Sequence, residues 1–184
     1  MRIISGELKG RRLKSVPGSG TRPTSDKIRE SIFNMIGPFF EGGISLDLYG
    51  GSGALSIEAL SRGVERAILV DVEPKAIETI KENVAALDLE ERVEVFRNDA
   101  YRALKALRKR DIKLRYVFLD PPYKKQKIQK EIEFLAEHEL LEPKAMIVAE
   151  HDARLQLPDE IGSCKLMKYE QYNSTTAVTI FVNG

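Results

Sequence analysis

The chain has 184 residues, of which 42% are apolar and 31% are charged, and its net charge is +1. This composition is that of one globular domain with a buried core, which excludes a largely disordered chain, and no apolar run approaches the ~18 residues of a membrane span. The start lacks the apolar core of a signal peptide, and the one cysteine, Cys164, forbids an intramolecular disulfide, so we expect a cytoplasmic protein that is not bound to a membrane.

Positive charge is concentrated at the start of the chain. Residues 1–30 hold eight Lys or Arg and three Asp or Glu, a net charge of +5, so the other 154 residues carry −4. A basic arm on a nearly neutral body is typical of a protein that binds a polyanion, although a solvated tail has the same composition. We expect one domain over residues 1–184, with residues 1–24 as a basic arm or hairpin in which Arg11 and Arg12 contact the polyanion.

The first predicted helix follows a turn-rich stretch at 15–20. Thr24 or Ser25 can cap it, and Gly37-Pro38 ends it. One face of this helix is apolar, with Ile28, Ile32, Met35 and Ile36.

Strands and helices then alternate along the chain. Strands are predicted at Ile44–Tyr49, Ala67–Asp71, Val93–Phe96, Tyr116–Asp120 and Ala145–Glu150, and helices at Ala54–Arg62, from Pro74 to Leu87, at Ala100–Arg110 and at Gln126–Glu137. This alternation predicts an α/β fold whose parallel sheet is covered on both faces. Two more strands, Lys165–Tyr169 and Thr176–Val182, have no helix between them, so we expect a C-terminal antiparallel hairpin and seven strands in all.

A glycine-rich turn follows the first strand of the sheet. Gly50, Gly51 and Gly53 let the backbone approach a ligand, and Asp71 at the end of the next strand is placed to accept hydrogen bonds from ribose hydroxyls. The third glycine of a dinucleotide fingerprint is Ser56 here, and the P-loop lysine is missing. A carboxylate at Asp47 disfavours a pyrophosphate and favours a cation. S-Adenosylmethionine, with an ammonium, a sulfonium and no phosphate, fits these residues.

Three further residues are assigned to the same cofactor site. Val72 directly follows Asp71, and Asp99 and Ala100 belong to the segment Asn98-Asp99-Ala100, which closes the third strand of the sheet. The carboxylate of Asp99 can bind the adenine amino group, but it can equally cap the following helix, and the sequence leaves both roles open.

The segment Asp120-Pro121-Pro122-Tyr123 ends the fourth strand of the sheet. An exocyclic amine of a base is a poor nucleophile because its lone pair is conjugated with the ring. Asp120 and the carbonyl of Pro121 can accept its two N–H groups, while Pro122 stiffens the loop and Tyr123 offers a face for stacking an extruded base. A simple strand-end turn is the alternative. We predict that this loop carries the catalysis.

These residues resemble class I S-adenosylmethionine-dependent methyltransferases with a DPPY motif. The chain is further similar to the RsmD family in four segments, which are Met1–Gly6 with Gly10-Arg11, Arg22-Pro23-Thr24, Arg29–Asn34 and Gly51–Gly63. The resemblance implies a Rossmann-like fold and methylation of the N2 amine of one guanine in 16S ribosomal RNA. It also implies that Arg22 and Thr24 lie near the methionine end of the cofactor and the RNA. Tyr49-Gly50 and Asn173-Ser174 depart from the commoner family residues without touching the inferred chemistry.

Several alternatives remain at this point. An adenine-N6 methyltransferase acting on RNA or DNA has the same motif, although no spare segment is available for target recognition. A nicotinamide oxidoreductase has no use for the DPPY segment, and a non-catalytic RNA-binding protein does not need Asp120 or Tyr123. Basic residues after that segment can hold RNA phosphates or form the solvated face of a helix, and those assigned to RNA are Lys124, Lys125 and Lys127.

The expected partner is ribosomal RNA or the small-subunit particle, and we expect a monomer. Two histidines and one cysteine make a structural zinc site improbable, so no metal is expected. His138, His151 and Cys164 are given no functional role.

Overall fold

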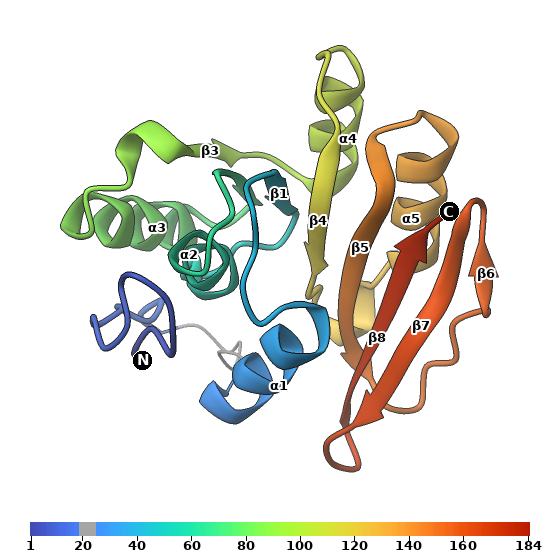
Figure 1. Cartoon of the computed structure of the whole chain (residues 1–184), viewed down its shortest axis with the longest axis horizontal. Helices are drawn as coiled ribbons and strands as arrows, with labels where there is room; N and C mark the ends of the chain where they lie inside the picture. Colours follow the sequence, from blue (N-terminus) through green and yellow to red (C-terminus); the bar gives the residue numbers. More distant parts are fainter. Residues whose placement is uncertain (19–24) are drawn as a thin grey trace.

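The computed structural model describes residues 1–18 and 25–184, and eight strands of these residues form one sheet (Figure 1). The strand order is β3-β2-β1-β4-β5-β8-β7-β6. The strands are β1 (Ile44–Asp47), β2 (Arg66–Asp71), β3 (Val93–Arg97), β4 (Leu114–Leu119), β5 (Leu141–Asp152), β6 (Glu160–Ile161), β7 (Cys164–Gln171) and β8 (Thr176–Asn183). The first five strands pair in parallel, and β8, β7 and β6 extend the sheet with antiparallel pairs.

The predicted fold class is therefore confirmed, with one correction to the strand count. The eighth strand, β6, has two residues and pairs with the start of β7. Two residues are too few to show the alternation by which a strand is read from sequence, so the prediction of seven strands was wrong by one.

Five α-helices of the described residues connect these strands, namely α1 (Asp26–Ile36), α2 (Ala54–Ser61), α3 (Pro74–Ala86), α4 (Ala100–Arg108) and α5 (Ile128–Glu137). Their starts follow from local chemistry. The Ser25 side chain accepts a hydrogen bond from the backbone N–H of Ile28, at 3.1 Å, and thus caps α1. Pro74 occupies the first position of α3, where its missing N–H costs nothing.

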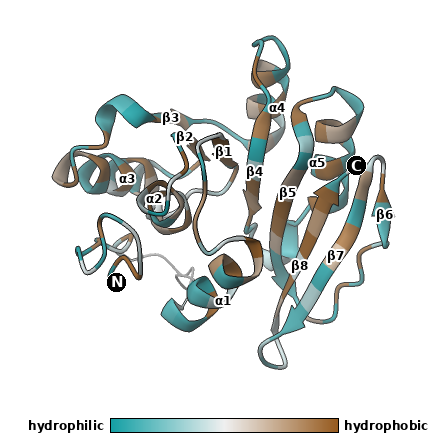
Figure 2. Cartoon of the chain, viewed as in Figure 1, coloured by the Kyte–Doolittle hydropathy of each residue, from teal (hydrophilic) through white to brown (hydrophobic). Residues whose placement is uncertain are grey.

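The core lies in two layers, one on each face of the sheet. The cluster on the first face combines side chains of α1, α2 and α3 with Phe118, Val148 and Ile180 of the strands. The cluster on the second face combines α4 and α5 with the alternate strand residues, such as Val117 and Ile147. Figure 2 shows the hydrophobic residues concentrated in β1, β4, β5 and β8, whereas β7 is largely hydrophilic.

The start of the chain packs against α2 rather than extending into solvent. Backbone N–H groups of Ile4 and Ser5 donate to the two carboxylate oxygens of Glu58, at 2.9 and 3.0 Å. Glu58 also forms ion pairs with Arg62, at 2.8 Å, and with Arg29, at 3.5 Å, and the side chains of Glu58 and Arg29 are fully buried. Arg29 is one of the eight basic residues counted in segment 1–30. Because its side chain is buried in an ion pair with Glu58, it is not available to a polyanion.

Candidate active site

The strand order brings the motifs to one edge of the sheet. Strand β1 lies between β2 and β4, and all three run in parallel, so the glycine turn after β1, Asp71 at the end of β2 and the loop after β4 are neighbours. This topology brings the segment Asp120–Tyr123 beside the glycine turn. Open α/β sheets bind ligands at this edge, which makes it the candidate active site.

The side chain of Asp71 joins the glycine turn to the loop that follows β2. The backbone N–H of Gly51 donates to Asp71 Oδ2 at 2.9 Å, and the backbone N–H of Glu73 donates to Asp71 Oδ1 at 2.9 Å. Gly53 has φ +86°, which a residue with a Cβ rarely adopts, and it directly precedes α2. A carboxylate oxygen accepts two hydrogen bonds, so each Asp71 oxygen keeps capacity for a ligand hydroxyl.

Asp47 is a buried carboxyl group at the same edge. Only 2% of it is exposed, and burial raises its pKa to about 7, with a further increase from the charge of Asp71 and an opposing hydrogen bond from the Tyr49 N–H. That N–H donates to Asp47 Oδ1 at 2.9 Å. A carboxyl group held in this way takes a proton easily, and a positively charged ligand would instead stabilise its ionised form.

The other residues assigned to the cofactor are Val72, which follows β2, and Asp99 and Ala100, at the start of α4. The side chain of Asp99 accepts a hydrogen bond from the backbone N–H of Arg102 at 2.8 Å, so the helix-cap interpretation of this residue is confirmed. The Asn98 N–H donates to the Asp71 carbonyl at 3.0 Å and holds the ends of β2 and β3 together. Val72 is apolar yet 51% exposed beside this edge. The roles of Val72, Asp99 and Ala100 toward an adenine stay predictions.

The loop after β4 is short and stiff. Asp120 directly follows the last residue of β4, and Pro122 has φ −55° and ψ 132°, an extended conformation. The Lys125 N–H donates to the Pro122 carbonyl at 3.0 Å, which closes a single turn of 3-10 helix over Tyr123–Lys125. Pro121 is buried, so the loop is anchored to the body of the protein on one side and faces solvent on the other.

Tyr123 is held with part of its ring accessible. It is 37% exposed, and its hydroxyl donates to Thr176 Oγ1, at 3.3 Å, at the start of β8. Partial burial raises the pKa of its phenol, and the charges of Glu150, Asp120 and Asp152 act in the same direction. The ring is therefore neutral, positioned and available for stacking.

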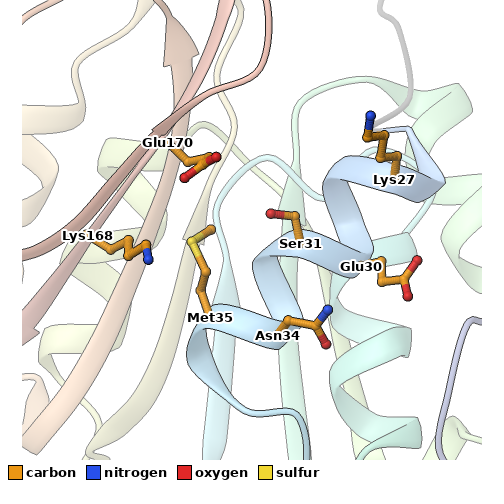
Figure 3. A pocket seen from close by; sticks show the side chains of 7 residues that line it. All are labelled: Lys27, Glu30, Ser31, Asn34, Met35, Lys168 and Glu170. Atoms are coloured by element: carbon orange, nitrogen blue, oxygen red, sulfur yellow. The ribbon is translucent and has the colours of Figure 1, made fainter.

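A groove not foreseen from the sequence lies on the α1 face of the sheet (Figure 3). It has a volume of about 620 Å³ and is lined by Lys27, Glu30, Ser31, Asn34 and Met35 of α1 and by Lys168 and Glu170 of β7. Ser31 and Tyr172 form a hydrogen bond of 2.5 Å between their hydroxyl oxygens, which joins α1 to the turn between β7 and β8. The two walls, α1 and β7, are about 140 residues apart in the sequence, so no local sequence motif predicts this groove.

The basic residues assigned to RNA occupy different places. Lys124, Lys125 and Lys127 are exposed directly after the segment Asp120–Tyr123. Arg11 donates to the Ala86 carbonyl, at 3.2 Å, at the far end of α3 from the cofactor edge, and the exposed Arg12 forms a β-bridge with Arg2. Arg22 and Thr24 lie outside the described residues.

Two kinds of feature, a membrane-spanning helix and a cluster of metal ligands, are absent from the described part of the chain. No helix within 1–18 and 25–184 is long and apolar enough to cross a membrane. No group of three or more His, Cys, Asp or Glu side chains within the same ranges could hold a metal ion.

Known proteins that are similar to this chain are named as methyltransferases, which agrees with the geometry of the candidate site. The model of a family described as "Conserved hypothetical protein 95" matches residues 1–181. A Bacillus subtilis protein named "Putative rRNA methyltransferase YlbH" is 53% identical over 175 residues, which cover 95% of each chain. "Ribosomal RNA small subunit methyltransferase D" of Escherichia coli K12 is 32% identical over 158 residues, 86% of this chain and 78% of that one.

A solved structure shares the arrangement of the elements. The structure described as "Putative methyltransferase yhhF from Escherichia coli" superposes with a TM-score of 0.83 at 28% identity and covers 100% of this chain and 97% of the other. The α/β architecture of the described residues is thus that of a class I methyltransferase.

Proposed function

This chain belongs to the family described as conserved hypothetical protein 95, and on that premise we propose that it methylates the exocyclic N2 amine of a guanine in small-subunit ribosomal RNA, with S-adenosylmethionine as the donor. The observation that carries the proposal is the meeting of two motifs at one sheet edge. Asp47 and Asp71, which suit a nucleoside with a positive charge, lie beside the loop Asp120–Tyr123, which suits an exocyclic amine.

The residues at the cofactor edge fit S-adenosylmethionine. Asp71 keeps acceptor capacity for the ribose hydroxyls while it fixes the glycine turn. The raised pKa of the buried Asp47 marks a carboxyl group that gains from a nearby cation, and the donor carries an ammonium and a sulfonium. When bound, the donor supplies an electrophilic methyl group. Val72, Asp99 and Ala100 complete the proposed site around the adenine.

The loop after β4 acts on the nucleophile. Asp120 accepts one N–H of the target amine and the Pro121 carbonyl accepts the other, which draws the nitrogen toward a tetrahedral form with a free lone pair. Tyr123, held by Thr176, stacks on the extruded base and directs the amine toward the methyl group. Pro122 keeps the loop extended before the substrate arrives, so little reorganisation is needed at the moment of transfer.

The RNA is held by basic side chains around this loop and along the arm. Lys124, Lys125 and Lys127 contact phosphates next to the extruded nucleotide. Arg11 and Arg12 lie at the far end of α3, a helix of 13 residues or about 20 Å, so they contact RNA distant from the target base. Arg22 and Thr24 complete the proposed substrate contacts. We further propose that the protein acts as a monomer in the cytoplasm.

The test is to identify the methylated nucleoside. The protein is incubated with labelled S-adenosylmethionine and unmodified small-subunit RNA or particles, and the RNA is digested to nucleosides and separated. N2-methylguanosine is the expected product. N6-methyladenosine would replace the proposed substrate by adenine, and transfer to no nucleoside with either substrate would refute the function.

A further inference from the structure

A second carboxylate, Glu150, stands next to Asp120. Strands β4 and β5 pair in parallel up to Leu119 and Ala149, so the residues that follow, Asp120 and Glu150, are neighbours across the two strands. Side chains alternate along a strand, and directly opposed residues of parallel strands point to the same face. Phe118 and Val148, two residues earlier, both pack in the cluster beneath α1, α2 and α3. The side chains of Asp120 and Glu150 therefore emerge side by side on that face.

Two tyrosine hydroxyls, those of Tyr123 and Tyr172, lie near Glu150. Its negative charge contributes to raising the pKa of Tyr123 and also that of Tyr172, so its carboxylate lies within electrostatic range of both phenols. Tyr123 is tied to Thr176 and Tyr172 to Ser31, so both rings are fixed in place. Glu150 is half-buried, at the end of β5 next to the loop that follows β4.

The catalytic loop by itself does not distinguish guanine from adenine. Asp120 and the Pro121 carbonyl accept N–H groups of an exocyclic amine, and both bases carry one. The ring nitrogen N1 next to that amine does differ, since it is an N–H donor in guanine and a lone-pair acceptor in adenine. A carboxylate beside Asp120 can accept from the guanine N1–H but opposes the adenine lone pair.

We propose that Glu150 reads the N1–H of the target guanine and thereby restricts methylation to guanine. This inference rests on the proposed function and names a specificity-determining residue for it. Sites built to pair a donor of the substrate reject analogues that lack the donor by about 10⁴-fold or more when the partner is left buried and unpaired. Because Glu150 is half-buried, we expect discrimination of about 10²-fold.

The experiment replaces the target guanosine by 2-aminopurine, which keeps the exocyclic amine at C2 but has an unprotonated N1. Methyl transfer to RNAs with either base at the target position is measured as kcat/KM for the wild type and for Glu150→Gln. We expect the wild type to favour guanosine by about 10²-fold. The glutamine amide can donate to the unprotonated N1, so the variant should bring the two substrates to within about tenfold of each other.

A matched control separates this effect from general loss of charge. Glu170 of β7 lies opposite Val178, which lies opposite Glu150, so it is on the same face two strands away. Glu170→Gln should keep the wild-type ratio between the two substrates. Thermal unfolding and donor binding of each variant establish that it is folded.

The outcomes separate the inference from the proposed function. A wild-type enzyme that methylates guanosine but treats 2-aminopurine equally would overturn the inference alone. A Glu150→Gln variant with the wild-type ratio, or a Glu170→Gln variant with the same loss of ratio as Glu150→Gln, would do so as well. A wild-type enzyme that methylates no guanosine would overturn both.

Discussion

The buried carboxyl group of Asp47 makes a sharp prediction about stability and pH. Its pKa is raised from 3.8 to about 7 in the folded protein, mainly by burial. The folded state therefore keeps this proton up to about pH 7, whereas the unfolded chain has lost it above about pH 4. The free energy of unfolding consequently falls as pH rises between these values, by about 1.4 kcal/mol for each pH unit, and is constant above them.

Asp47→Asn removes this proton and keeps an oxygen for the Tyr49 N–H. Between pH 5 and pH 8 the wild type should lose about 3 kcal/mol through Asp47, and the variant should lose none of it. Urea unfolding of both proteins without ligand, at pH 5, 6, 7 and 8, measures the difference, because all other titrations cancel. A stability difference that does not change with pH would refute the reasoning.

The same group links pH to cofactor binding. A cationic donor favours ionised Asp47, so its binding should release a proton and strengthen as pH rises through about 7. In Asp47→Asn this part of the pH dependence should vanish and the affinity should fall. Calorimetry of both proteins over the same range cancels the titration of the donor's own amine, and equal pH profiles would exclude Asp47 from the site.

The remaining predictions use simpler variants. Asp71→Ala should weaken S-adenosylmethionine binding by about 1–3 kcal/mol, because the ribose hydroxyls lose a charged acceptor, and calorimetry showing wild-type affinity would remove Asp71 from the site. Replacing Arg11, Arg12 and Lys14 by Ala should reduce the salt slope of RNA binding by up to about three, whereas an unchanged slope would make the arm a solvated surface. Glu131 is buried, and burial raises its pKa from 4.5 to about 7 in the folded protein. The folded state keeps this proton to a higher pH than the unfolded chain, so the free energy of unfolding falls as pH rises through this range. Between pH 4.5 and 8 the free energy of unfolding of Glu131→Gln should rise by about 3 kcal/mol relative to that of the wild type. A difference between the two proteins that does not change with pH would contradict this.

The fold was readable from the sequence where local patterns dominate. Buried parallel strands are continuous apolar runs, and the helix starts carry Ser25, Pro74 and Asp99, whose capping or conformational preferences act within a few residues. The neighbouring positions of the glycine turn and the Asp120 loop follow from the usual strand order of an open α/β sheet. These parts need no knowledge of distant contacts.

The parts that were missed depend on contacts between distant segments. Arg29 was counted among the basic residues of segment 1–30, but its burial with Glu58 is decided by the contact between α1 and α2. Glu150 lies within a predicted strand and has no motif of its own, so its place beside Asp120 follows only from the β4–β5 register. The groove between α1 and β7 is likewise formed by segments far apart in the chain.

The central claim is that Asp120 activates the target amine, and single-turnover methylation by Asp120→Ala tests it most directly. The proposed interaction is made as the methyl group transfers, so its loss should slow the chemical step by at least about 10²-fold. RNA affinity, measured beside it, should change much less because phosphate contacts dominate it. Asp120→Asn keeps an acceptor oxygen without the charge, so its single-turnover rate should lie between those of the wild type and Asp120→Ala. A folded Asp120→Ala variant that methylates at nearly the wild-type rate would contradict the account.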